Sequence, residues 1–216
     1  MEILPAIIED TYEEVARRMQ FIGPHVGTVQ IDLADGVFVP RTTWLRIGDL
    51  VSVHSAFKID LHAMVHDPLR YAQQAESILP IRRITFHIES TDCVRATAEY
   101  IHHIGREVGL AINPDTAVGA LAPFIDAIDA VLVMGVRPGW GGQDYIPATG
   151  ARVRDIKQHW PHIMVGVDGG IHLRTGSAQE CVNAGADFLV AGSGIFKAHD
   201  PLDALRRFQA LSPTGL

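Results

Sequence analysis

The chain has 216 residues, of which 47% are hydrophobic and 20% are charged. This length suits one domain with a large core, because two domains would each be small for an interior of their own. The formal net charge of -7 disfavours nucleic acid or an acidic membrane surface as the main partner.

The first segment, MEILPAIIEDTYEE, carries acidic residues where a secretory signal would carry basic ones. No apolar run in the chain reaches the roughly 18 residues that a membrane span needs. Cys93 and Cys181 are far apart and match no metal-binding spacing, so we expect reduced thiols. These features predict a cytoplasmic protein with no membrane partner.

Short apolar runs alternate with amphipathic segments along the whole chain. The apolar runs predict strands at 2–7, 27–32, 57–62, 82–87, 107–112, 130–135, 163–167 and 187–191. The segments between them predict helices at 11–22, 44–53, 68–78, 92–104, 116–127, 145–159, 173–183 and 199–210. Runs such as AVLVMGV and DFLVAGS are almost continuously apolar, which is typical of parallel strands that helices cover.

Eight strand–helix units in this length predict a single α/β domain, a (β/α)8 TIM barrel over residues 1–211 with a C-terminal tail at 212–216. An open, doubly wound sheet is the main alternative. Such a sheet usually has fewer strands, and no G-x-G-x-x-G turn follows the first predicted strand.

Polar side chains stand where predicted strands end, which is where barrel enzymes place their functional groups. Asp32 ends the second predicted strand, His62 ends the third, and Asp168 follows the seventh. One imidazole and two carboxylates suit a divalent transition metal, and paired carboxylates also suit acid–base chemistry. The alternative is that each acid caps a helix or pairs with a neighbouring base.

Glycine-rich segments follow the last three predicted strands. They contain Gly139, Trp140, Gly141, Gly142, Gly169, Gly170, Gly192 and Ser193. Glycine lets backbone amides approach an anion closely, and the last loops of a barrel often bind phosphate. The pattern therefore favours a phosphate site over simple tight turns.

Other polar residues near the predicted mouth have weaker assignments. Arg41 and Arg137 lie where they could hold an anion, and Asp35 and His87 could orient neighbouring groups through hydrogen bonds. Eight other histidines are expected to be solvated: His25, His54, His66, His102, His103, His159, His172 and His199.

With these segments identified, the chain resembles the ribulose-phosphate 3-epimerase family along nearly its whole length. The passages IDLADGVFVP, DLHAMVHDP, VLVMGVRPGWGGQDYIP, VGVDGGI and AGADFLVAGSGIF occur in the order and spacing of that family. The resemblance implies a TIM barrel of the ribulose-phosphate-binding type. It also implies an isomerase of carbohydrate metabolism, in the pentose phosphate reactions, that inverts C3 of D-ribulose 5-phosphate to give D-xylulose 5-phosphate.

The resemblance further implies roles for individual residues. Asp32 would be the base and Asp168 the opposing acid, acting through a metal-stabilised enediolate. Asp32, His62 and Asp168 would bind a divalent cation (Zn, Fe, Mn or Co), with His62 also near the substrate. The glycine-rich segments would hold the phosphate of the ketose, Met64 and Met134 would stand around the site, and relatives that form dimers or hexamers imply a homo-oligomer.

The chain departs from the family pattern at the predicted mouth. Gln30 stands where the family has a histidine ligand, and a glutamine oxygen is a weaker ligand for zinc or iron than imidazole. Ala6, Ala34, Arg41 and Asn113 replace the usual serine, methionine, asparagine and lysine. Two alternatives therefore stay open: a 3-epimerase of another ketose phosphate, such as a hexulose 6-phosphate, and a non-catalytic sugar-phosphate binder.

Overall fold

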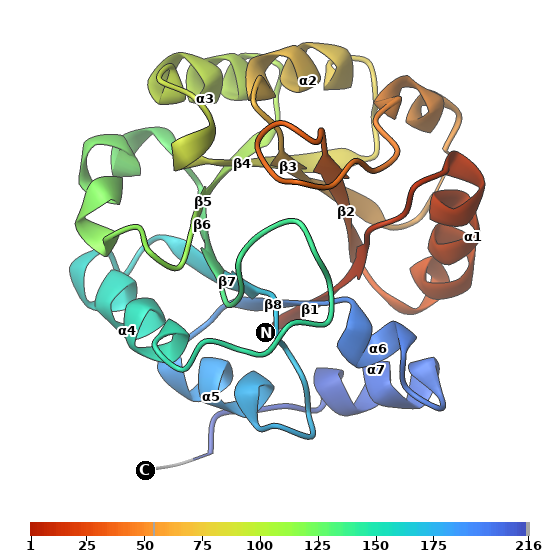
Figure 1. Ribbon diagram of the computed structural model, residues 1–216, viewed down its shortest axis with the longest axis vertical. Coiled ribbons are helices and arrows are strands. Elements are labelled where there is room, and N and C mark those ends of the chain that lie inside the picture. The colour runs from red at the N-terminus through yellow and green to blue at the C-terminus, as the bar shows by residue number, and fades with distance from the viewer. Residues whose placement is uncertain (54, 215–216) are drawn as a thin grey trace.

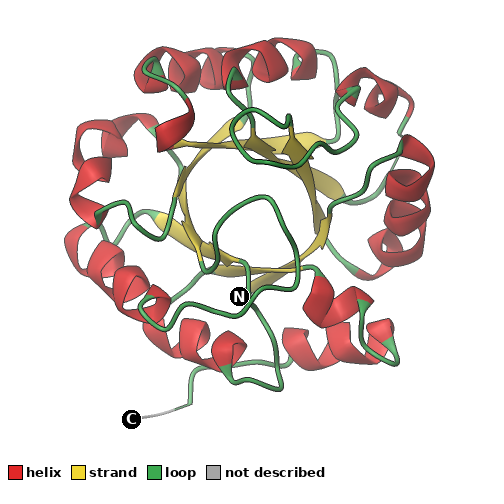
Figure 2. Cartoon of the chain, in the orientation of Figure 1, coloured by secondary structure: helices red, strands yellow, loops and turns green. Residues whose placement is uncertain are grey.

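The computed structural model describes residues 1–53 and 55–214, which contain a closed barrel of eight parallel strands. The strands pair in chain order, and the last strand pairs with the first. Helices form a ring outside the strands (Figures 1 and 2). This topology confirms the predicted (β/α)8 barrel and rules out the open, doubly wound sheet.

The observed strands overlap all of the predicted ones. The strands are β1 (Glu2–Ile7), β2 (Thr28–Ala34), β3 (Lys58–Met64), β4 (Ile81–His87), β5 (Glu107–Ile112), β6 (Ala130–Met134), β7 (Met164–Asp168) and β8 (Phe188–Ala191). The α-helices are α1 (Tyr12–Ile22), α2 (Pro68–Ala75), α3 (Val94–His103), α4 (Thr149–His159), α5 (Ser177–Ala184), α6 (Ser193–Phe196) and α7 (Pro201–Gln209). The 3-10 helices are η1 (Gly23–His25), η2 (Ile47–Ser52), η3 (Ile88–Ser90) and η4 (Val118–Ala127).

Two predicted helices are 3-10 helices in the structure. The segment predicted at 44–53 forms η2, and the segment predicted at 116–127 forms η4. Pro123 lies inside η4, where it has no amide hydrogen for an α-helical bond and its ring clashes with the preceding turn. Gly48 in η2 gives little helical preference.

Two further helices, α4 and α5, begin four residues later than predicted. The helix predicted from 145 begins at Thr149, because the amide of Ile146 donates to the carbonyl of Gly135 and holds that segment beside β6. The helix predicted from 173 begins at Ser177, after Gly176 in the left-handed conformation (φ 81°).

Capping residues explain where two outer helices begin. Asp67 accepts a hydrogen bond from the amide of Arg70 and precedes α2, whose first residue is proline. Asp200 accepts from the amides of Leu202 and Asp203 before α7, which also begins with proline. A carboxylate at the N-cap accepts hydrogen bonds from amides of the first turn that have no partner within the helix. Proline at the first helical position has no amide hydrogen that would need a partner. Together they favour a helix start at these two positions.

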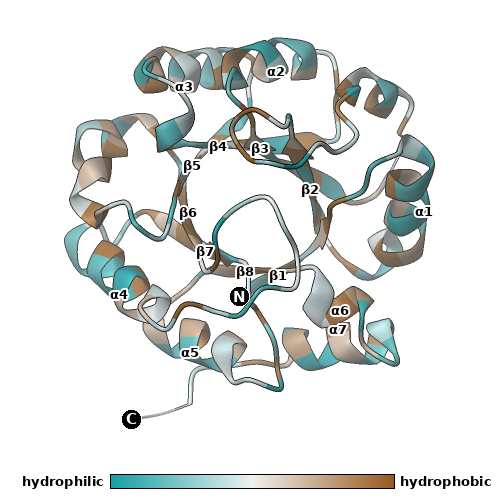
Figure 3. Ribbon diagram, viewed as in Figure 1, coloured by the Kyte–Doolittle hydropathy of each residue, from teal (hydrophilic) through white to brown (hydrophobic). Residues whose placement is uncertain are grey.

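The buried apolar residues form three clusters. The largest lies between the strands and the ring of helices, and the second fills the barrel interior with residues such as Leu4, Leu132, Phe188 and Val190. The third is small and consists of Ala34, Val39 and Met64. Figure 3 shows that the helices carry both hydrophilic and hydrophobic residues, as expected for elements with one face on the core. A tightly packed interior holds the strand ends, and therefore the site, in fixed positions.

A charged side chain also occupies the barrel interior. Arg83 is 1% exposed and lies over the Phe188 ring, 4.7 Å from its centroid. Its guanidinium is 3.0 Å from Glu107 and 3.5 Å from Asp60. Sequence patterning did not predict this cluster, because a single arginine in an apolar run does not reveal that acids from neighbouring strands meet it.

Part of the predicted C-terminal tail lies against α5. Gln179 donates to the carbonyl of Ser212, and Asn183 accepts from the amide of Thr214. The last two residues of the tail, 215–216, and His54, which was expected to be solvated, lie outside the described residues. Among the described residues, no helix has both the length and the apolar character required to cross a membrane.

Candidate active site

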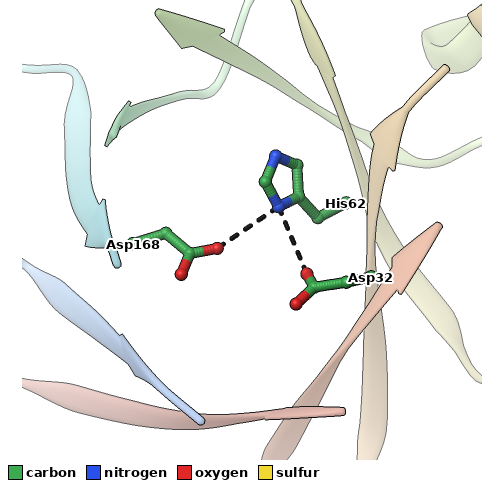
Figure 4. A group of neighbouring side chains, drawn as sticks. All are labelled: Asp32, His62 and Asp168. Carbon is green, nitrogen blue, oxygen red and sulfur yellow. Dashed lines mark hydrogen bonds and ion pairs between the residues drawn. The ribbon is translucent and has the colours of Figure 1, made fainter. Parts of the chain in front are cut away.

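The barrel brings together three residues predicted from the strand ends. Asp32 and His62 are direct partners in the pairing of β2 with β3, and Asp168 ends β7. His62 Nδ1 lies 3.2 Å from Asp32 Oδ1 and 3.2 Å from Asp168 Oδ2. In Figure 4 the two carboxylates approach the same ring nitrogen from different sides. The side chains are 1% (His62), 8% (Asp32) and 13% (Asp168) exposed, so the group is largely shielded from water.

The electrostatics of this group follow from burial and mutual contact. Burial raises the pKa of Asp32 above its ordinary value, and the nearby Asp168 charge raises it further, against the hydrogen bond with His62. Burial alone would lower the pKa of His62, but its contacts with Asp168 and Asp32 outweigh that effect and raise the pKa to about 9. The cluster is therefore an environment that favours positive charge.

These three residues fit a divalent cation. One potential ligand atom from each of Asp32, His62 and Asp168 lies within 4.8 Å of the others. Carboxylate oxygens and an imidazole nitrogen are ligands that divalent transition metals accept. The environment that raises the pKa of His62 would likewise stabilise a bound cation.

Gln30, at the position where the sequence departs from the family pattern, belongs to the same group. Gln30 is 2% exposed. Its Nε2 donates to Asp32 Oδ1 at 2.7 Å and to Asp168 Oδ2 at 2.7 Å. The same nitrogen lies 3.4 Å from His62 Nδ1. The amide therefore touches the same atoms that fit a cation.

His87 and Glu89 orient the His62 ring from the side opposite the two carboxylates. His62 Nε2 lies 2.9 Å from His87 Nε2, and the two rings are stacked with centroids 5.1 Å apart. His87 Nδ1 lies 3.4 Å from Glu89, which also accepts from the amide of Asn113. Burial lowers the pKa of His87, so this ring is neutral near pH 7 and can accept a hydrogen from His62. Such partners fix the ring so that Nδ1 faces the carboxylates.

The predicted phosphate residues line the same cavity as the acidic group. This cavity has a volume of about 260 Å³, and it is lined by Asp32, His62 and Asp168 together with Gly139, Trp140, Gly141, Gly142, Gly169, Gly170, Gly192 and Ser193. Gly169 has a φ of +98°, and an added Cβ there would lie 2.4 Å from Val136. Only glycine fits that backbone without strain, so the local geometry depends on it.

Arg41 joins two loops at the cavity mouth. Its guanidinium lies 5.4 Å from the ring centroid of Trp140 and donates to Asp10 at 3.0 Å. Arg41 follows β2, whereas Trp140 lies in the loop between β6 and α4, which reaches over the barrel in Figure 2. This contact places a cation at the entrance of the cavity. Arg137 also lines the cavity and pairs with Asp115.

Some cavity residues were not predicted from the sequence, and one histidine outside the cavity lining, His172, is less exposed than expected. Arg18 and Lys197 line the cavity, but neither lies in a motif, and only the fold brings them there. His172 was expected to be solvated; it is half-buried, with Nε2 3.3 Å from the Ser193 hydroxyl.

Two methionines expected around the site and two alanines that depart from the family pattern do not all reach the cavity. Met64, Met134 and Ala6 line the cavity, whereas Ala34 is buried beside Val39. A small side chain at position 34 therefore adds no space to the cavity itself.

Sequence comparison identifies relatives over most of the chain. A sequence model described as "Ribulose-phosphate 3 epimerase family" matches residues 2–196. The ribulose-phosphate 3-epimerase of Schizosaccharomyces pombe is 32% identical over 216 residues, covering 94% of this chain and 90% of the relative. The Mycobacterium tuberculosis protein of that name is 35% identical over 191 residues, covering 83% of this chain and 80% of the relative.

Solved structures with lower identity share the fold. Streptococcus mutans KGPDC, in complex with D-R5P, superposes with a TM-score of 0.70 at 16% identity and covers 96% of this chain and 95% of that one. The 3-hexulose-6-phosphate synthase of Salmonella typhimurium superposes with a TM-score of 0.68 at 18% identity, covering 96% of both chains. At such identities the similarity supports the barrel architecture alone.

Proposed function

The chain belongs to the ribulose-phosphate 3-epimerase family, matching its sequence model over residues 2–196, and we propose that it converts D-ribulose 5-phosphate to D-xylulose 5-phosphate. The observation that carries this proposal is the meeting of Asp32 and Asp168 in a cavity that glycine-rich loops also line. Inversion at C3 needs an acid–base pair at the carbon, and the phosphate of the substrate needs an anion site.

Asp32 removes the proton from C3, and the electron pair of the broken C–H bond moves into the neighbouring carbonyl to give an enediolate. Protonated Asp168 then donates a proton to the opposite face of C3, which restores the carbonyl and inverts the centre. After one turnover the proton is on Asp32 and Asp168 is ionised, so the pair is set for the reverse reaction.

The hydrogen-bond pattern leaves one oxygen of each carboxylate available for proton transfer. Contacts with Gln30 and His62 use Oδ1 of Asp32 and Oδ2 of Asp168. No residue of the described chain hydrogen-bonds the second oxygen of either carboxylate, which leaves that oxygen for proton exchange with the substrate. Asp32, His62 and Asp168 would hold a divalent cation, which when bound supplies positive charge that stabilises the enediolate.

The glycine-rich loops that line the same cavity suit the phosphate. The proposed phosphate contacts are backbone amides of Gly139 to Gly142, Gly169, Gly170 and Gly192, with the Ser193 hydroxyl. Arg41 and Lys197 line the same cavity, and their charges complement a dianion.

The deciding experiment is incubation of the metal-supplemented protein with D-ribulose 5-phosphate in D₂O, followed at C3 by proton NMR. We expect D-xylulose 5-phosphate carrying deuterium at C3. If the substrate forms no product and exchanges no proton, while the same protein binds metal, the proposed pentulose activity is wrong.

A second candidate is epimerisation of a hexulose 6-phosphate. The observation that favours it is the cavity wall, where the small Ala6 and the long Arg41 both face the ligand space and would accept a longer sugar. The same NMR assay with a hexulose 6-phosphate separates the two, because the preferred substrate gives the larger kcat/KM. A non-catalytic binder would instead show a rise in Tm with either sugar phosphate and no exchange at C3.

A further inference from the structure

The amide group of Gln30 lies directly beside the place that a cation held by Asp32, His62 and Asp168 would take. Nε2 is 2.7 Å from Asp32 Oδ1, 2.7 Å from Asp168 Oδ2 and 3.4 Å from His62 Nδ1. Divalent transition metals bind such atoms at about 2.0–2.2 Å. A cation among these three atoms would therefore be in contact with the amide nitrogen.

An amide nitrogen is not a ligand for that cation. A glutamine NH₂ group has two hydrogens to donate, and here one is directed to each carboxylate. These hydrogens place the positive end of the amide dipole between two acids, which imitates a cation in its absence. The amide and a metal ion therefore compete for the same carboxylate oxygens.

The glutamine side chain can resolve this competition without moving its backbone. The terminal torsion of glutamine is soft and nearly two-fold, so a half-turn of the amide exchanges Nε2 for Oε1. That turn replaces a donor facing the two carboxylates with an oxygen facing the cation. Gln30 is 2% exposed and lies on β2, paired with Ala6 of β1 and Asp60 of β3, so its backbone is fixed.

We propose that Gln30 is a two-state ligand, which bridges Asp32 and Asp168 through Nε2 in the metal-free protein and binds the metal through Oε1 after its amide turns. This inference rests on the metal site assigned in the proposed function. It goes further, because it gives a role to Gln30, the residue that replaces the family's histidine, and predicts which metals the site prefers.

The metal preference follows from the donor set. With Gln30 the site offers three oxygens and one nitrogen, whereas a histidine at that position would give two oxygens and two nitrogens. Oxygen ligands suit Mn²⁺ and Mg²⁺, and imidazole suits Zn²⁺. The site should also bind every metal less tightly than its histidine variant, since two charge-assisted hydrogen bonds must break first.

Calorimetric titration of the metal-free protein with Mn²⁺ and with Zn²⁺, in the absence of substrate, tests the preference. We expect Gln30→His to tighten Zn²⁺ binding by at least tenfold, roughly the lower end of the effect of orienting partners, and to change Mn²⁺ binding much less. Gln30→Leu should weaken both metals by a similar factor. Gln74→His, on the exposed face of α2, is the matched control and should change neither.

The turn of the amide has its own readout. In protein labelled with ¹⁵N-glutamine, Zn²⁺ or Mg²⁺ should shift the Gln30 NH₂ signals and speed their exchange with water, because metal binding removes their carboxylate acceptors. The resonance is assigned by its through-bond correlation to the backbone of Gln30 in the unmutated chain. This measurement uses the unmutated chain, so it holds even if a variant folds poorly.

Two results would overturn the inference: unchanged Zn²⁺ and Mn²⁺ affinities in both Gln30 variants, or NH₂ signals that stay fixed when the metal saturates the site. Failure of the proposed function is a separate result. If the predicted metal preference and amide shift appear but C3 of the pentulose phosphate exchanges no proton, the metal assignment stands and the proposed substrate is wrong.

Discussion

Asp32 and Asp168 carry the same functional group but approach the site from different strands, so their amide variants distinguish the two faces of the substrate. Asp32→Asn and Asp168→Asn should each lower kcat by about 10²–10⁴-fold, the usual contribution of an acid or base. Asp168→Asn should still exchange the C3 proton of D-ribulose 5-phosphate with D₂O without inverting it. Asp32→Asn should lose that exchange but retain it for D-xylulose 5-phosphate.

Proton NMR of both sugars in D₂O measures these exchange rates. Asp92→Asn, an exposed residue before α3, is the control and should behave like the unmutated protein. Equal loss of exchange on both sugars in both aspartate variants would contradict the assignment of one aspartate to each face.

His87 should act on metal binding through the His62 ring. Its contact with His62 Nε2 at 2.9 Å orients that ring, and loss of such a partner typically lowers metal affinity by about 10–100-fold. His87→Phe keeps a ring beside His62 but removes the hydrogen-bond acceptor, so calorimetry with Mn²⁺ should show this weakening. A His87→Gln variant retains a polar partner and should recover part of the affinity, which a purely packing role would not explain.

At the scale of elements, Asp35 connects two loops at the barrel mouth. Its carboxylate accepts from the amides of Val37 and Phe38 after β2 and from the amide of His66 after β3. Burial alone would raise the pKa of Asp35, but these amide hydrogen bonds outweigh burial and lower it. A carboxylate with a lowered folded-state pKa stabilises the protein above its unfolded pKa and loses that effect as pH falls through the folded value.

Asp35→Asn should therefore destabilise the protein at pH 7 by about 1 kcal/mol, a modest value because the carboxylate is partly solvated. The difference from the unmutated chain should shrink as the pH falls below about 4, through the lowered folded-state pKa of Asp35. Urea denaturation at pH 7, 5 and 3 measures this. A difference that stays constant with pH would show that the charge of Asp35 is not responsible.

The elements also show what patterning can predict. The strands could be predicted because parallel strands that are buried on both faces appear in the sequence as nearly continuous apolar runs. The prediction of ordinary helices was wrong at η2 and η4, which are 3-10 helices. Apolar periodicity is judged over a window of many residues, whereas Pro123 removes a single backbone hydrogen bond within η4. The start of α4 at Thr149 depends on a backbone bond to Gly135, which is a tertiary contact that no local signal carries.

At the scale of the whole molecule, barrel closure depends on a close fit between a glycine and an aromatic ring. An added Cβ on Gly166 of β7 would lie 2.1 Å from the ring of Phe188. Gly166→Ala should lower the free energy of unfolding by about 1–3 kcal/mol, as expected for overpacking of a tight core. Gly48→Ala is the control, because its Cβ would meet nothing within 4 Å, and it should be neutral or slightly stabilising. Equal effects of the two substitutions in urea denaturation would contradict this account.

The part of the candidate site that could be predicted is the part that barrel topology alone brings together. Asp32, His62 and Asp168 all stand at the ends of strands, and a parallel barrel brings those ends to one rim. Arg18 and Lys197 were not predictable, because they reach the cavity from α1 and from the segment after α6. Gln30 and Asp32 are two residues apart on β2, so strand alternation places them on one face. The hydrogen bond of Gln30 to Asp168 depends on how β2 and β7 face each other across the barrel, which sequence spacing does not encode.

The two sets of residues that line the cavity present different targets to mutation. Asp32, His62, Asp168 and the neighbouring Gln30 act through individual side chains, so one substitution there alters the chemistry of the site directly. The glycine-rich loops offer mainly backbone amides, which most substitutions elsewhere leave in place and which only a change of loop shape would remove. If these loops bind the phosphate as proposed, laboratory selection for new reactions should yield variants that differ at β2 and β3 and still act on phosphorylated substrates. This barrel is therefore a suitable starting point for a set of enzymes that share phosphate recognition and differ in the reaction they catalyse.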